Sequence, residues 1–115
     1  MMVVTRLSVL LVLFVLTASA ARWEVQFFHD QDRSSMRFND IEFPSAKRGV
    51  AVGVTIKDGD EDPVALITTD GGATWSAADA PEPGISLFFL DETADWMVTR
   101  SGIWFTDEVG RTWKR

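Results

Sequence analysis

The sequence contains no cysteine and no tyrosine, and only one histidine, in 115 residues. The absence of cysteine excludes a disulfide framework, a thiol nucleophile, a lipoprotein anchor and a thiolate metal site. Basic residues are also scarce, because 11 lysines and arginines stand against 17 acidic residues, which gives a net charge of -6. A chain with this balance offers no basic face to meet phosphates, which argues against nucleic acid and anionic membrane surfaces as partners.

The amino-terminal residues predict an export signal over residues 1–20. Arg6 precedes the apolar run Leu7–Leu16, and Ala18-Ser19-Ala20 has the order of small residues that a signal peptidase cleaves. A membrane-spanning helix needs about 20 apolar residues, so this shorter run favours a cleaved signal over an anchor. Cleavage after Ala20 leaves 115 − 20 = 95 residues and, with Arg6 lost, a net charge of -7. Export without cysteine favours a periplasmic or extracellular location.

The remaining residues, 21–115, consist of short β-rich runs separated by Gly, Pro, Asp and Ser clusters. Ile67–Trp75 aligns with Phe105–Trp113, since both follow T-x-(D/E)-x-G-x-T-W at an offset of 113 − 75 = 38 residues. Upstream, Ile41–Phe43 aligns with Phe88–Leu90 at an offset of 88 − 41 = 47 residues. The difference predicts nine extra residues in the first unit, in a loop around Lys57–Pro63.

Each unit predicts four short strands, and four strands in about 40 residues is the size of a propeller blade. The predicted fold class is therefore all-β, with two four-stranded blades of a partial β-propeller after the signal peptide. The units cover about residues 36–77 and 85–115, joined by Ala78–Gly84. The expected strands are Phe38–Phe43, Val50–Ile56, Val64–Thr69 and Thr74–Ala77, then Ile85–Leu90, Trp96–Thr99, Gly102–Thr106 and Thr112–Arg115.

The repeated turn resembles the Asp-box, also called the bacterial neuraminidase repeat. The longer pattern F-P-S-A-K-R-G-V-A-V-G, followed by L-I-T-T-D-G-G-A-T-W, is similar to blades of the photosystem II assembly and stability factor group. The resemblance covers about Phe38 to Trp113 and implies a β-propeller of several blades, which this chain is too short to complete. The structural Asp-box residues that it implies are Thr68, Asp70, Gly72, Thr74 and Trp75, and Thr106, Glu108, Gly110, Thr112 and Trp113.

The chemistry of the turn indicates a structural role. Asp70 is placed to accept hydrogen bonds from backbone amides of the following turn, as short acidic side chains do. Gly72 and Gly110 would supply the positive φ that a tight turn needs. Glu108 replaces Asp in the second turn, and its extra methylene moves the carboxylate away from the short geometry. We therefore expect the second turn to be looser.

Asp58, Asp60 and Asp62 begin like a calcium-binding loop, with carboxylates at alternate positions. The sixth and twelfth positions are Pro63 and Thr69, where a calcium loop has Gly and Glu. The pattern favours a solvated acidic hairpin, with weak calcium binding as the alternative.

His29 lies in a polar stretch and is more typical of an exposed side chain than of a metal or acid–base site. The tryptophans favour packing over carbohydrate stacking, because Trp75 and Trp113 recur at the repeat spacing. Trp104 and Phe105 are adjacent on an expected strand and point to opposite faces. One of these two can therefore face a partner.

These patterns favour a non-catalytic exported scaffold or protein-binding module, similar to assembly-factor propellers, that binds a protein partner or associates with itself. The alternative is a fragment of an Asp-box, sialidase-like glycoside hydrolase, or a carbohydrate-binding protein. Sialidases use a Tyr nucleophile, which this sequence lacks. No nucleophile elbow, phosphate loop or metal-ligand spacing occurs, so no catalytic, cofactor-binding or metal residue is expected.

Overall fold

Seven antiparallel strands in two sheets make up the computed structural model, which describes residues 23–31 and 33–115. The described residues contain no helix, and so no helix able to cross a membrane. The all-β class is therefore confirmed. The predicted signal peptide, residues 1–20, lies outside the described residues and stays a prediction.

The first four strands form a sheet in chain order, here called the large sheet. Its strands are β1 Ser35–Glu42, β2 Gly49–Lys57, β3 Asp60–Thr68 and β4 Ser76–Ala78. The last strand is shorter than expected, because Thr74 and Trp75 belong to the preceding turn. Each strand pairs only with its neighbours in the chain, which is the simple meander of a propeller blade.

The second sheet, here called the small sheet, has three strands in chain order. They are β5 Ser86–Phe89, β6 Asp95–Val98 and β7 Ile103–Thr106. The expected fourth strand, Thr112–Arg115, is wrong, because only a single bridge between Phe105 and Lys114 stands in its place. The chain here follows a turn with weaker hydrogen bonding, described below.

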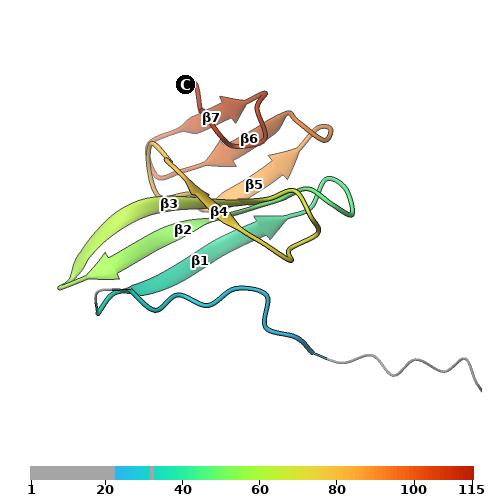
Figure 1. Ribbon diagram of the computed structural model, residues 1–115. Coiled ribbons are helices and arrows are strands. Elements are labelled where there is room, and N and C mark those ends of the chain that lie inside the picture. The colour runs from blue at the N-terminus through green and yellow to red at the C-terminus, as the bar shows by residue number, and fades with distance from the viewer. Residues whose placement is uncertain (1–22, 32) are drawn as a thin grey trace, which may run out of the picture.

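The extra residues of the first unit do not form the expected loop around Lys57–Pro63. They lengthen β2 and β3 into a hairpin that closes on Asp58 and Gly59. These two residues have φ of 51° and 85°, the left-handed conformation of a tight two-residue hairpin turn. β2 and β3 therefore extend well past β4, while β1 runs beside almost the whole length of β2 (Figure 1).

The strand pairing also corrects the upstream alignment by one residue. Gly49 pairs with Thr68 and Asp95 pairs with Thr106, and the two threonines hold the same place in the repeated turn. The offset is therefore 95 − 49 = 46 residues, not 47, and the first unit carries 46 − 38 = 8 extra residues. A slip of one residue exchanges the two faces of a strand, so this correction decides which side chains are equivalent.

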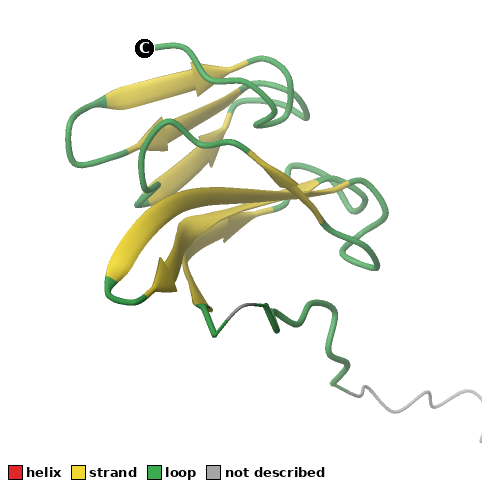
Figure 2. Cartoon of the chain, turned by 60° about the vertical axis from the view of Figure 1, so that its left-hand side comes forward, coloured by secondary structure: helices red, strands yellow, loops and turns green. Residues whose placement is uncertain are grey.

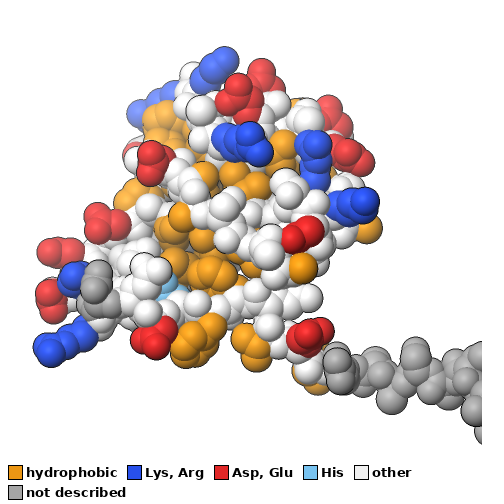
Figure 3. All heavy atoms as spheres, viewed as in Figure 1, with side chains coloured by type: hydrophobic (Ala, Val, Ile, Leu, Met, Phe, Trp, Pro, Cys, Tyr) orange, Lys and Arg blue, Asp and Glu red, His pale blue; other side chains and the backbone are white. Residues whose placement is uncertain are grey.

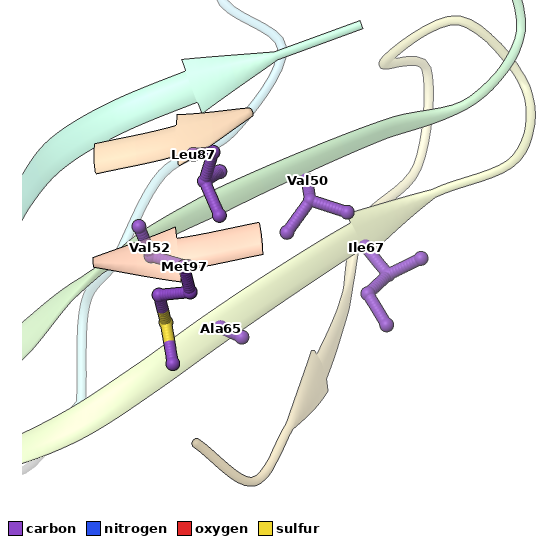
Figure 4. Close-up of a cluster of buried hydrophobic side chains, with 6 residues drawn as sticks. All are labelled: Val50, Val52, Ala65, Ile67, Leu87 and Met97. Carbon is purple, nitrogen blue, oxygen red and sulfur yellow. The ribbon is translucent and has the colours of Figure 1, made fainter. Parts of the chain in front are cut away.

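The two sheets lie face to face, and the main core fills the space between them (Figures 1 and 2). The buried side chains come from β2 and β3 on one side and from β5 and β6 on the other (Figure 4). Burial of this kind contributes roughly 25 cal/mol per Å² of apolar surface, and a second, smaller buried cluster of Ala51, Val64 and Leu66 lies on the other face of the large sheet. The members of the main core are Val50, Val52, Ala65, Ile67, Leu87 and Met97.

The connector passes close beneath this core at Gly84. A Cβ built on Gly84 would lie 2.6 Å from Val52 Cγ2 and 2.8 Å from Met97 Sδ, so no larger residue fits without moving the sheets apart. Asn39 Nδ2 donates to the Gly84 carbonyl at 2.7 Å, and the Leu87 amide donates to Asp40 Oδ2 at 2.7 Å. The first bond ties β1 to the connector, and the second joins the first strands of the two units.

Candidate protein-interaction surface

The first repeated turn is held by its own side chains. Thr68 Oγ1 accepts from the Gly72 amide at 2.9 Å and donates to Asp70 Oδ1 at 2.9 Å. The same carboxylate accepts from the amide and the hydroxyl of Thr74, and these bonds lower the pKa of Asp70, Thr74 contributing most. Trp75 Nε1 donates to the Gly72 carbonyl at 3.0 Å. Asp70 is therefore an ionised acceptor that closes the turn.

The second turn repeats this arrangement incompletely. Thr106 Oγ1 accepts from the amides of Glu108 and Gly110, at 3.1 and 3.2 Å, and the Thr112 hydroxyl donates to Glu108. Among the described residues, nothing accepts from the buried Trp113 Nε1. Gly72 and Gly110 both have positive φ, 93° and 80°, as the sequence predicts. The assignment of these turns to the Asp-box family stays a prediction.

Asp70→Ala should lower the melting temperature more than Glu108→Ala does. The first substitution removes acceptors from Thr74 and Thr68, whereas the second removes a single side-chain bond to Thr112. Thermal unfolding of the two variants, followed by circular dichroism, measures the difference. Equal losses at the two sites would show that the turns are equally well held.

The acidic hairpin carries the three candidate calcium ligands. Asp58 lies in the turn itself, and Asp60 and Asp62 lie on β3. Glu61 projects to the other face and pairs with Arg37 across 3.2 Å, both side chains being about half exposed. Within residues 23–31 and 33–115, no three His, Asp or Glu side chains are placed to hold a metal ion.

A carboxylate that the sequence did not single out joins the connector to the small sheet. Glu82 accepts from Trp104 Nε1 at 2.9 Å and from the hydroxyls of Thr99 and Ser101. These bonds, with Ser101 first, lower the pKa of Glu82 to about 2, and the charge of Arg115 adds to the effect. Trp104 thus faces the connector and is not free for a ligand.

A second overlooked carboxylate, Asp95, is fully buried at the start of β6. Its Oδ1 accepts from the Phe88 amide at 3.0 Å, but among the described residues nothing pairs with Oδ2. Burial raises the pKa of Asp95 to about 7, with a smaller contribution from the negative charges of Glu42 and Asp40. The equivalent residue in the first unit is Gly49, so comparing the two repeats did not predict a carboxylate at this position.

The face of the small sheet turned away from the core, here called the outer face of the small sheet, is apolar. Phe88, Trp96 and Phe105 lie opposite one another on the three strands and form one aromatic row. The Trp96 and Phe105 rings lie 4.9 Å apart. Val98 and Ile103 are opposite each other in the next row that points to this face, and both are exposed. Among the described residues, no element covers this face.

The face of the large sheet turned away from the core, here called its outer face, holds an apolar groove of about 240 Å³. Phe27, from the amino-terminal stretch, lies at its edge and meets Phe38 edge-on at 6.2 Å. That stretch runs along the side of the large sheet opposite the small one (Figure 1). Figure 3 shows apolar side chains in the middle of the molecule and along the edge next to this stretch. The groove is lined by Gln26, Phe27, Phe38, Ile41, Ala51, Leu66 and Trp75.

No protein-family model matches the chain, and no curated protein matches it. Among solved structures, the chain is similar to "YCF48 bound to D1 peptide", with 19% identity and a TM-score of 0.42. The likeness covers 75% of this chain and 44% of that chain, so the chain spans less than half of that structure's length. A likeness of this size gives no information about the partner of this chain.

The remaining candidate residues lie apart from one another. His29 is half-buried rather than exposed, and its Nε2 is 2.7 Å from the Ser34 hydroxyl. Trp23 is fully exposed, while Trp75 packs edge-on against Phe43 at 5.8 Å. Of the adjacent pair on β7, Phe105 is the one on the outer face. The aromatic row was not predicted from the sequence, although alternate apolar residues in β5, β6 and β7 signal a face of this kind.

Proposed function

We propose that the protein is a non-catalytic, exported protein-binding module built of Asp-box propeller repeats. The observation that carries the proposal is the uncovered outer face of the small sheet, with its aromatic row of Phe88, Trp96 and Phe105. Large exposed apolar patches on soluble proteins mark interaction sites, and aromatic residues are enriched in the centre of protein interfaces. Val98 and Ile103 extend the row into a continuous apolar surface, which suits a protein partner better than a sugar.

The polar clusters support a structural role for the carboxylates. Asp70 and Glu82 accept several hydrogen bonds each, and their lowered pKa values keep them ionised at neutral pH. An ionised carboxylate fully occupied by such bonds does not donate a proton to a substrate. Asp95 has a raised pKa but is fully buried, so a substrate does not reach it.

Export is supported by the amino-terminal order of Arg6, the apolar run Leu7–Leu16 and Ala18-Ser19-Ala20. The protein would then work in the periplasm or outside the cell. A carbohydrate is the alternative ligand, since exposed aromatic rings also stack on sugars.

Photo-crosslinking tests the proposed binding surface. Benzoylphenylalanine is placed at Phe88 in the full chain, in the cells that produce it, and at Asp58 as a control. Both side chains are exposed, but Phe88 belongs to the aromatic row, whereas Asp58 lies in the turn of the β2–β3 hairpin. We expect a protein adduct from position 88 and none from position 58. Equal adducts at both positions, no adduct at 88, or a glycan adduct alone would contradict the proposal.

A further inference from the structure

The two outer faces are equivalent, row by row, to the two faces that meet inside the molecule. The pairing of Gly49 with Thr68 and of Asp95 with Thr106 fixes the correspondence. The row Ile41–Ala51–Leu66 on the outer face of the large sheet matches Leu87–Met97–Trp104, which faces the core. The outer face of the large sheet is therefore equivalent to the core-facing side of the small sheet.

The same correspondence holds in the other direction. Val50 and Ile67 of the large sheet face the core, and their equivalents in the small sheet are Trp96 and Phe105 on its outer face. The outer face of the small sheet is therefore equivalent to the core-facing side of the large sheet. One molecule carries both halves of a junction that it already forms once within itself.

The sizes of the side chains on the two outer faces complement each other. On the outer face of the small sheet, Trp96 and Phe105 stand where the core-facing side of the large sheet has Val50 and Ile67, so the side chains on this outer face are larger. On the outer face of the large sheet, Ala51 and Leu66 stand where the core-facing side of the small sheet has Met97 and Trp104, so the side chains there are smaller. Packing density in a junction is conserved when large residues on one side meet small residues on the other.

The groove lies beside these smaller side chains of the large sheet. Ala51 and Leu66 form part of its lining, and Phe38 and Ile41 of β1 stand along its side. Phe38 and Ile41 are 40% and 53% exposed, so an approaching sheet reaches them. Gln26 and Phe27 of the amino-terminal stretch also line the groove, so an incoming aromatic row packs against this stretch as well as against β1.

We propose that a second copy of this chain covers these faces, in a head-to-tail stack. The outer face of the small sheet of one copy packs on the outer face of the large sheet of the next. This inference rests on the proposed function, since it names the partner of the same apolar surface. A head-to-tail contact closes into a ring when its rotation allows, and propellers have about 4–8 blades.

Pairs of complementary variants test the head-to-tail arrangement by light scattering. Phe88→Lys blocks the small-sheet face, Ile41→Lys blocks the large-sheet face, and Asp58→Lys, in the turn of the β2–β3 hairpin, is the control. We expect the unmodified chain and the Asp58 variant to associate and each blocked variant to be monomeric. An equimolar mixture of the two blocked variants should form a heterodimer and nothing larger, because one good face remains on each.

Several results would overturn the inference. These are a monomeric unmodified chain, a mixture that stays monomeric, or one blocked variant that still self-associates, which indicates a symmetric contact. Val98→Lys and Phe38→Lys form a second pair, and circular dichroism shows which variants are folded. If the unmodified chain is monomeric while position 88 cross-links to another protein, the head-to-tail stack is wrong and the proposed function stands.

Discussion

We expect the protein to unfold at a higher urea concentration at pH 5 than at pH 8, and Asp95→Asn to remove most of that difference. Burial raises the pKa of Asp95 from its ordinary value of 3.8 to about 7 in the folded protein. The folded state therefore holds a proton that the unfolded state releases between these values. Stability is fully present below the unfolded pKa and falls as the pH rises through the folded one. Between pH 5 and pH 8 the loss is about 2–3 kcal/mol.

The substitution isolates this effect because asparagine keeps the shape and the acceptor for the Phe88 amide and does not ionise. The variant should gain stability at pH 8 relative to the unmodified chain. Glu82 acts in the opposite sense, since its folded pKa is lowered to about 2, and its contribution is lost as the pH falls from about 4.5 toward 2. Urea midpoints for both proteins at pH 5 and 8 decide the matter. An unmodified midpoint that is unchanged between these pH values would show that Asp95 ionises normally.

The positions of most strands could be predicted because the turn signature recurs at a fixed spacing. The pattern T-x-(D/E)-x-G-x-T-W fixes where the third strand of each unit ends, and alternating apolar residues locate the first two. The register could not be predicted to the residue, because the apolar runs before Gly49 and Asp95 align almost equally well one place apart. Only the pairing with Thr68 and Thr106 settles it.

The long hairpin of the large sheet could have been found from a local signal. Asp58-Gly59 is a strong two-residue hairpin sequence, and Val54–Lys57 before it is rich in β-branched residues. The count of extra residues placed them in a loop, whereas each extra residue has a partner on the opposite strand. Asp60 and Asp62 therefore belong to a strand and not to an irregular loop.

The carboxylates with shifted pKa values could not be predicted, since their partners are distant in the sequence. Glu82 binds side chains 17 to 22 residues further on. Asp95 is buried by the packing of two sheets, and its neighbours Asp40 and Glu42 come from the other unit. The aromatic row could be read as one face of a sheet from its alternation, but which face the core covers depends on how the sheets stack.

All that is proposed about the outer face depends on the way the small sheet lies on the large one, with Met97 inward and Val98 outward. Met97 is fully buried at the junction and Val98 is 43% exposed, although they are neighbours on β6. Replacing Met97 by alanine leaves a cavity among Val52, Leu87 and the connector. Such a substitution costs about 2–5 kcal/mol, a large part of the stability of a small domain.

The most direct test is the free energy of unfolding of Met97→Ala and Val98→Ala. It is measured by urea unfolding, at a protein concentration low enough to keep the chains monomeric. We expect Met97→Ala to lose about 2–5 kcal/mol and Val98→Ala to lose well under half as much. Equal losses, or a larger loss at Val98, would show that the small sheet buries its other face, and the aromatic row would then be part of the core.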